Sequence, residues 1–112
     1  MRAGRPSDAQ GMEQGRFQTA LDAWFEAGAT RAAGEIENVG RGGLFVGTAA
    51  IPEEGELVNI EFSAPDGERI RVTGIVWWTT QDRAANGQAP GFGVRLVDEN
   101  ASFEGLLDQL AG

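Results

Sequence analysis

The residues best suited to chemistry are arginines and the glycine-rich stretch Glu35–Thr48, EIENVGRGGLFVGT. A glycine-rich turn can bring backbone N–H groups against a phosphate. It can equally let the chain reverse between two strands through residues of positive φ. Every basic residue of the chain is arginine, whose planar fork binds phosphate and stacks on flat bases. A nucleotide-contacting loop and a plain interstrand turn are therefore both open interpretations.

Other kinds of chemistry are excluded by composition. The chain has no cysteine and no histidine, which removes disulfide scaffolds, thiolate zinc sites, cysteine nucleophiles and histidine-dependent triads. The acidic residues lack the aspartate-rich spacing of a calcium loop, and no carboxylate pair stands out for acid–base work. We expect a protein that is not an enzyme, with no catalytic residue, metal or cofactor.

Length and charge limit the partners and the location. The 112 residues suit one domain with one modest core. The net charge of −8 disfavours binding to DNA, RNA or anionic lipid. No segment is apolar enough to span a membrane, and the N-terminus lacks the apolar core of a signal peptide. We expect a cytoplasmic protein that does not insert into membranes.

Alternation of apolar and polar residues predicts strands through most of the chain. Residues 1–15 have no periodicity and are expected to form a flexible tail before a domain at 16–112. Helix is an alternative for residues 17–26, because Ala and Leu favour it. The segment NVGRGG (38–43) is too rich in glycine to predict regular structure, and Gly74 marks a bulge or a close approach. The predicted strands are 17–26, Gly34–Val39, Leu44–Thr48, 57–62, Arg69–Thr80 and Phe92–Val97.

A helix is expected at about 101–111, with Asn100 or Ser102 as its cap. Its apolar residues form one helical stripe that must pack on something beneath it. Six short antiparallel strands and one terminal helix predict a small β-barrel or closed sandwich, with the helix over one mouth or face. The stripe consists of Phe103, Leu106, Leu107 and Leu110.

The tryptophans are candidates for a protein interface. Adjacent strand residues point to opposite faces, so if Trp78 packs inward with Val76, Trp77 faces outward unless a bulge intervenes. Trp24 lies opposite the face that carries Phe25. Exposed tryptophans often anchor interfaces, although the helix or the N-terminal tail could cover them. Trp24 and Trp77 are the two candidate interface residues.

Several motifs, in this order, resemble the PilZ domain family. Asn38–Val46, NVGRGGLFV, is similar to the family's Asn-x-Ser-x-Gly-Gly-Leu-Phe-Val stretch. EEGELVNIEF, SAPDGERIRVTGIVWW and PGFGVRL follow at fitting spacing. The resemblance covers about Arg16 to Leu110. It implies a six-stranded β-barrel, and in many members binding of the bacterial second messenger cyclic di-GMP.

The resemblance also implies which residues would bind the ligand. The family uses Arg-x-x-x-Arg before the first strand and Asp/Asn-x-Ser/Ala-x-x-Gly after the second. Arg16 matches the second arginine, but Met12 stands where the first should be. Asn38 and Gly43 match the second motif, whereas Gly40 replaces serine or alanine. The alternative is that another arginine, Arg41 or Arg31, compensates for the lost one.

Taken together, the motifs favour a stand-alone, non-enzymatic PilZ-type adaptor, plausibly in motility. It would act by binding an unknown protein, with weak or no cyclic di-GMP binding. The alternative is a genuine cyclic di-GMP receptor that binds through Arg16 and the loop 38–43.

Overall fold

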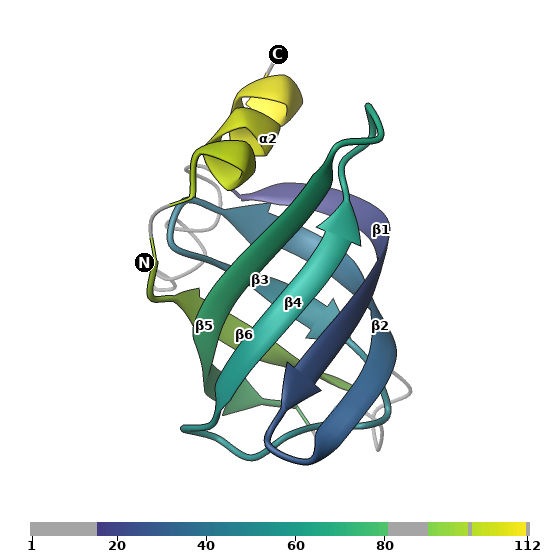
Figure 1. The fold of residues 1–112 in the computed structure, drawn as a ribbon, viewed down its shortest axis with the longest axis vertical. Helices are drawn as coiled ribbons and strands as arrows, with labels where there is room; N and C mark the ends of the chain where they lie inside the picture. Colours follow the sequence, from purple (N-terminus) through teal and green to yellow (C-terminus); the bar gives the residue numbers. More distant parts are fainter. Residues whose placement is uncertain (1–15, 81–89, 99, 112) are drawn as a thin grey trace, which may run out of the picture.

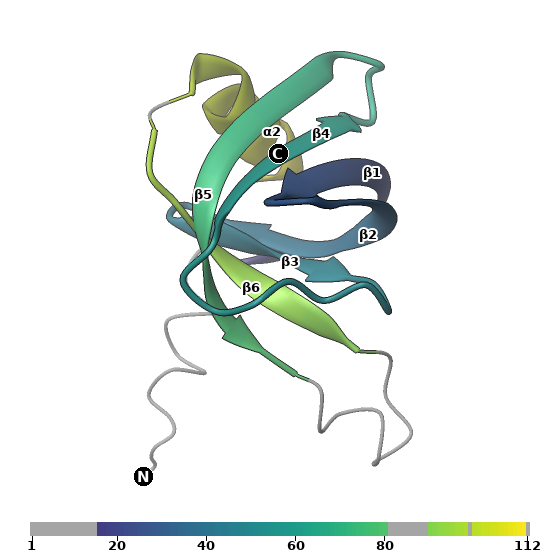
Figure 2. The same ribbon diagram turned by 60° about the horizontal axis from the view of Figure 1, so that its bottom comes forward.

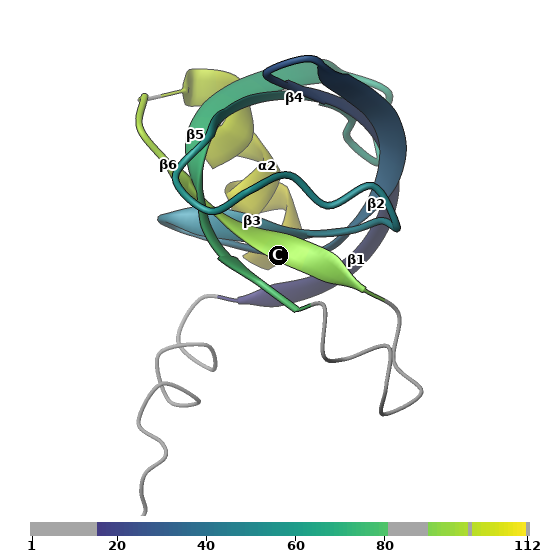
Figure 3. The same ribbon diagram turned by 90° about the horizontal axis from the view of Figure 1, so that it is seen from below.

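The computed structural model describes residues 16–80, 90–98 and 100–111. Six antiparallel strands close into a barrel in the order β1-β2-β3-β6-β5-β4, with helix α2 at one end (Figure 1). β3 and β6 run side by side (Figure 2), and a view along the barrel shows the strands as a ring (Figure 3). The elements are β1 (Phe17–Ala27), β2 (Thr30–Gly40), β3 (Gly43–Gly47), β4 (Leu57–Ser63), β5 (Arg69–Thr79), β6 (Gly91–Leu96) and α2 (Ala101–Ala111).

The expected antiparallel barrel with one C-terminal helix is confirmed. Residues 17–26 form a strand and not a helix, because alternate side chains such as Ala23 and Phe25 fill the barrel. Phe25 meets Phe92 edge to face, with ring centroids 5.1 Å apart. The predicted tail at 1–15 lies outside the described residues.

Glycines of positive φ close two of the hairpins. Gly28 (φ 59°) lies between β1 and β2, and Gly67 (φ 92°) lies between β4 and β5. Gly67 N also donates a hydrogen bond of 2.8 Å to the carbonyl oxygen of Ala64. Glycine suits both turns, since these backbone conformations strain any residue with a Cβ.

The prediction of irregular structure at 38–43 is wrong. β2 continues to Gly40 and β3 begins at Gly43, which leaves a turn of only Arg41 and Gly42. Among the described residues, this stretch contains no glycine of positive φ. Gly43 is needed for space instead, because a Cβ there would lie 2.1 Å from the carbonyl oxygen of Val94. β2 also begins earlier than predicted, at Thr30, because pairing with β1 outweighs the weak strand propensity of its first residues.

Trp78 does not pack inward beside Val76, because the bulge that the sequence analysis left open is present. The register between β5 and β6 shifts between these two residues, which marks an irregularity at Trp77. The alternation is lost there, and both tryptophans are exposed, Trp77 by 57% and Trp78 by 45%. Gly74 is a close approach and not the bulge, since its Cβ would lie 2.4 Å from a methyl group of Val94.

Helix α2 begins where the sequence predicts. The side-chain oxygen of Asn100 accepts a hydrogen bond of 2.9 Å from Phe103 N, so Asn100 is the N-cap. Ser102 donates to the carboxylate of Glu68 instead. Phe103 and Leu106 are buried in the barrel core, and the rest of the stripe packs against that core. The helix therefore closes one end of the barrel (Figure 1).

Candidate functional site

The fold brings together the two halves of the predicted ligand motif. Arg16 lies directly before β1, and its Nη2 donates to the side-chain oxygen of Asn38, 22 residues away. Its Nη1 lies 3.4 Å from the carbonyl oxygen of Gly43, 27 residues away. The pairing of β1 with β2 and of β2 with β3 creates this contact. Whether these residues bind a nucleotide remains a prediction.

The Arg16 side chain is partly shielded from solvent. Its side chain is half-buried, and burial lowers the pKa of the guanidinium from its usual value. The group stays charged at neutral pH, because the unperturbed pKa of arginine lies so far above 7. Its Nε is buried without a hydrogen-bond partner among the described residues. Arg16 therefore has one buried N–H donor for which the described residues supply no acceptor.

The neighbouring outer face of the barrel is aromatic. Cross-strand register places Asn38 beside Phe45, Phe45 beside Gly93, and Gly93 beside Trp78. Residues directly opposite in antiparallel strands share a face, so this row runs over β2, β3, β6 and β5. The Phe45 and Trp78 rings are 5.4 Å apart. A Cβ on Gly93 would lie 2.1 Å from Trp78 Nε1, so the indole rests on the glycine.

A cation borders this aromatic row. Arg95 is the cross-strand neighbour of Gly43 on one side and of Ile75 on the other. Its guanidinium carbon lies 4.8 Å from the centre of the Trp77 ring, a cation–π contact. The predicted interface residue Trp77 is therefore on the same side of the barrel as the Arg16–Asn38 contact. We call this surface, defined by Arg16, Asn38, Phe45, Trp77, Trp78 and Arg95, the β3–β6 face.

The sequence analysis did not single out Phe45, Trp78 or Arg95 as site residues. Phe45 and Arg95 could have been found from alternation, since each precedes or follows a core residue of its strand. Trp78 could not, because its orientation depends on the register shift in β5.

The other candidate residues lie apart from this site. Arg41 is exposed in the turn after β2, and Met12 is outside the described residues. Arg31 is seven residues from Asn38 along β2, or about 20 Å at strand spacing. The expectation that Arg31 could replace a lost ligand arginine at this site is therefore wrong.

The second interface candidate, Trp24, is on a different surface. It is 58% exposed on β1 and pairs across to Glu61 of β4. Trp24 is in register with Glu61 of β4 and, through it, with Arg71 of β5. Trp77 lies six residues beyond Arg71 on β5, which is about 20 Å at strand spacing. Trp24 and Trp77 therefore cannot form one patch.

Among the described residues, no group of three or more acidic side chains is placed to hold a metal ion. No helix in that part of the chain is long and apolar enough to cross a membrane.

Comparison with known proteins gives a family and a fold. The model of the PilZ domain family matches residues 11–111. No curated protein sequence matches the chain.

Two solved structures are similar. One is the Bacillus subtilis inhibitor of motility MotI/DgrA, with a TM-score of 0.73 and 16% identity over 87% of this chain and 48% of that one. The other is the PilZ domain of CeSA from a cellulose-synthesizing bacterium, with a TM-score of 0.60 and 17% identity. That match covers 85% of this chain and 92% of the CeSA domain. The chain spans about half the length of the Bacillus protein.

Proposed function

The chain belongs to the PilZ domain family, and on this premise we propose that it is a non-enzymatic regulatory adaptor that acts by binding another protein. One observation carries this proposal: all three tryptophans are between 45% and 58% exposed. Large aromatic side chains are expensive to leave in water and are enriched among the residues that dominate binding energy at interfaces. The similar Bacillus structure is that of an inhibitor of motility. This similarity supports motility as the process that the adaptor regulates.

In this proposal the adaptor binds cyclic di-GMP weakly or not at all. PilZ domains bind this dinucleotide as a ligand and not as a cofactor. Met12 replaces one of the two motif arginines, and Arg16 already donates to Asn38 and Gly43. Loss of one charged hydrogen-bonding partner costs about 1.5–3 kcal/mol, which is roughly one to two decades in affinity.

A second candidate function is a true cyclic di-GMP receptor. It is favoured by the assembly of Arg16, Asn38 and Gly43 at one place. The adjoining exposed Trp78 ring and Arg95 offer a flat surface and a cation to a planar, anionic ligand.

Titration of the full chain with cyclic di-GMP, followed by calorimetry and backbone amide NMR, separates the two functions. The adaptor proposal expects no saturable binding at low micromolar ligand. Saturable binding in that range that disappears in Arg16→Ala would establish the receptor and overturn the adaptor-only proposal. Absence of any chemical-shift change at millimolar ligand would eliminate the receptor.

A gain-of-function variant tests the reason for weak binding. Met12→Arg combined with Gly40→Ser restores both motif positions and should raise the affinity for cyclic di-GMP. The matched control is Arg41→Ala in the same background, which should bind more weakly only if Arg41 contacts the ligand. If the double variant binds no better than the parent, the motif losses are not what limits affinity.

A further inference from the structure

Trp24 is an exposed aromatic side chain on β1 that the predicted ligand motif does not use. Its neighbours along the strand, Asp22 and Glu26, point to the same outer face because strand side chains alternate. Across the sheet, Trp24 is directly opposite the small Ala33 of β2 on one side and Glu61 of β4 on the other. The ring therefore stands among three carboxylates, with only a methyl group on its β2 side.

A pair of like charges lies beside this ring. Asp22 and Glu35 are directly opposite each other in the pairing of β1 with β2, and both side chains are exposed. Like charges directly opposite each other in a sheet are destabilising. In the part of the chain that the structure describes, neither carboxylate forms an ion pair, because the ion pairs there both involve Glu61. The free protein thus carries an electrostatic repulsion that a cation from a partner would relieve.

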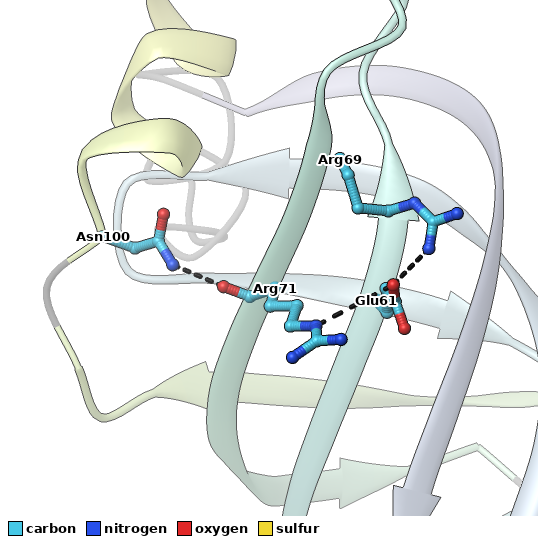
Figure 4. A network of polar contacts seen from close by, with 4 residues as sticks. All are labelled: Glu61, Arg69, Arg71 and Asn100. Carbon is cyan, nitrogen blue, oxygen red and sulfur yellow. Dashed lines mark hydrogen bonds and ion pairs between the residues drawn. The ribbon is translucent and has the colours of Figure 1, made fainter.

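Three arginines act on Glu61. This carboxylate accepts a hydrogen bond from Arg69 and lies 3.8 Å from Arg71 Nε, and Figure 4 shows both arginines directed at it. The hydrogen bond from Arg69, with the charges of Arg69, Arg71 and Arg31, lowers the pKa of the Glu61 carboxyl. Arg31 is also the cross-strand neighbour of Glu26. The positive charge therefore acts on Glu61 and Glu26 and leaves the opposed carboxylates of β1 and β2 uncompensated.

Negative charge predominates around Trp24 when these arginines are counted. The side chains next to Trp24 on its own strand and on both neighbouring strands carry four carboxylates and one guanidinium, which belong to Asp22, Glu26, Glu35, Glu61 and Arg31. Further out, Arg69 and Arg71 are accompanied by Asp98, whose carboxylate oxygen lies 3.4 Å from the backbone nitrogen of Thr73 on their strand. The surface is therefore net negative, like the whole chain, whose charge is −8. We call Trp24 and the four carboxylates the Trp24 face.

The Trp24 face is hollowed. A cavity of about 470 Å³ opens beside the Trp24 ring, and its charged lining residues are Glu26, Arg31, Glu61, Arg71 and Asp98. Its floor is stiff, because the strands on either side of Glu61 are paired with β4 there. Asn100, the cap of α2, also donates a side-chain hydrogen bond to the carbonyl oxygen of Arg71 (Figure 4). A side chain from a partner can therefore enter beside the ring without rearrangement of the barrel.

We propose that the Trp24 face binds a basic segment of the partner protein, with a lysine or arginine side chain of that segment on the Trp24 ring. A cation over a tryptophan ring gains cation–π attraction, and carboxylates bind arginine forks in two-point contacts. The inference rests on the proposed adaptor function and specifies the chemistry of its partner. The charge of −8 attracts a basic segment and repels a second copy of this chain.

The test is a titration of the isotope-labelled full chain with two peptides, followed by NMR. The probe is a ten-residue peptide in which lysine alternates with serine, and its control has glutamate in place of every lysine. The lysine peptide should shift the indole N–H signal of Trp24 and the carboxyl signals of Asp22 and Glu35, and the glutamate peptide should not. Binding should weaken as added salt shortens the screening length from about 10 Å to about 3 Å.

Variants locate the contact. Asp22→Asn combined with Glu35→Gln, and separately Trp24→Ala, should each weaken binding of the lysine peptide by roughly threefold or more. The double variant removes a like-charge pair, so the free barrel should be at least as stable as the parent in a thermal melt. Weaker binding by a variant of undiminished stability cannot be attributed to unfolding.

The matched control changes the same net charge elsewhere. Glu53→Gln combined with Glu54→Gln removes two carboxylates from the exposed turn before β4. Backbone hydrogen bonds join this turn to Val76 of β5, which is five residues beyond Arg71, the residue in register with Trp24, or about 17 Å at strand spacing. This variant should keep the affinity for the lysine peptide within about twofold.

Four results would overturn the inference. If the lysine peptide shifts Trp77 and not Trp24, the adaptor function survives but its docking face is the β3–β6 face. If both peptides shift Trp24 equally, or neither does at millimolar concentration, the face does not select basic segments. If the control in the turn before β4 weakens binding as much as Asp22→Asn with Glu35→Gln, only the total charge matters. Concentration-dependent shifts of Trp24 without peptide would make a second copy the occupant. The proposed adaptor function is tested separately by the cyclic di-GMP titration.

Discussion

At the scale of single residues, Arg16 joins the parts of the ligand motif. It is a half-buried cation between the side chain of Asn38 and the backbone of Gly43. A residue in this position stabilises the start of β1 as well as supplying charge to the surface. Its structural role and its predicted role in ligand binding can be separated by measuring stability without ligand.

Arg16→Ala is expected to lower the free energy of unfolding by about 1–3 kcal/mol, because it removes charged hydrogen bonds and leaves the Asn38 side chain without this partner. Urea unfolding followed by circular dichroism measures the change. Arg41→Ala is the matched control, since Arg41 is exposed in the turn, and it should stay within about 0.5 kcal/mol of the parent. Equal losses in the two variants would mean that the Arg16 contacts contribute nothing to stability.

Glu61 should make stability depend on pH in the acid range. Its folded-state pKa is lowered, chiefly by the hydrogen bond from Arg69. A lowered pKa stabilises the fold above the unfolded-state pKa, and that stabilisation is lost as the pH falls through the folded-state value. The advantage of the parent over Glu61→Gln should therefore shrink as the pH falls below the ordinary glutamate range.

The pKa of the Glu61 carboxyl can be measured directly by carbon NMR. Arg69→Gln is the control and should move the value upward toward that of an ordinary glutamate. A pKa that is the same in the parent and in Arg69→Gln would contradict the assignment of Arg69 as the main cause.

At the scale of elements, the turn between β2 and β3 shows two different uses of glycine. Gly43 is in a strand, where a Cβ would collide with the backbone of β6. Gly42 is in the turn, where a Cβ would meet no atom within 4 Å. The glycine-rich sequence therefore reflects close strand packing at Gly43 and open space around the turn at Gly42.

Gly43→Ala should destabilise the barrel by about 1–3 kcal/mol, because β3 and β6 must move apart to admit the methyl group. Gly42→Ala should be neutral or stabilising by up to about 1 kcal/mol, because its φ is not positive and alanine restricts the unfolded chain. Chemical denaturation compares the pair. Similar costs for both would show that the turn, and not strand packing, requires glycine.

At the scale of the whole molecule, the exposed tryptophans lie at two separate places on the barrel surface. One carries Arg16, Asn38 and the Trp77–Trp78 pair, and the other carries Trp24 beside Glu61 and Arg71 of the neighbouring strands. The core cluster, with Phe103 and Leu106 of helix α2, lies beneath both.

Trp24→Ala and Trp77→Ala should each leave the barrel folded, since both side chains are more than half exposed. Because the two positions share no contacts, the effects on unfolding free energy should add within about 0.5 kcal/mol in the double variant. Phe92→Ala, a fully buried control, should cost about 3–5 kcal/mol. Unfolding of Trp77→Ala at room temperature would instead assign that side chain to the core.

The sequence by itself determined the antiparallel strands, their inward-facing residues and the capped helix. These depend on local patterns: alternation at Ala23 and Phe25, the glycine turns at Gly28 and Gly67, and the Asn100 cap. The family and the residues of its ligand motif were also predictable, because Arg16, Asn38 and Gly43 are identifiable from type and order alone.

Only the tertiary structure decided which residues share a surface. The register shift in β5 turned Trp78 outward, and the pairing of β1, β4 and β5 placed Trp24 beside Arg71 and away from Trp77. It also carried Arg31 away from the ligand motif and into the cluster around Glu61. The physical reason is that register and closure depend on pairing between strands far apart in sequence, and no local pattern of residues specifies that pairing.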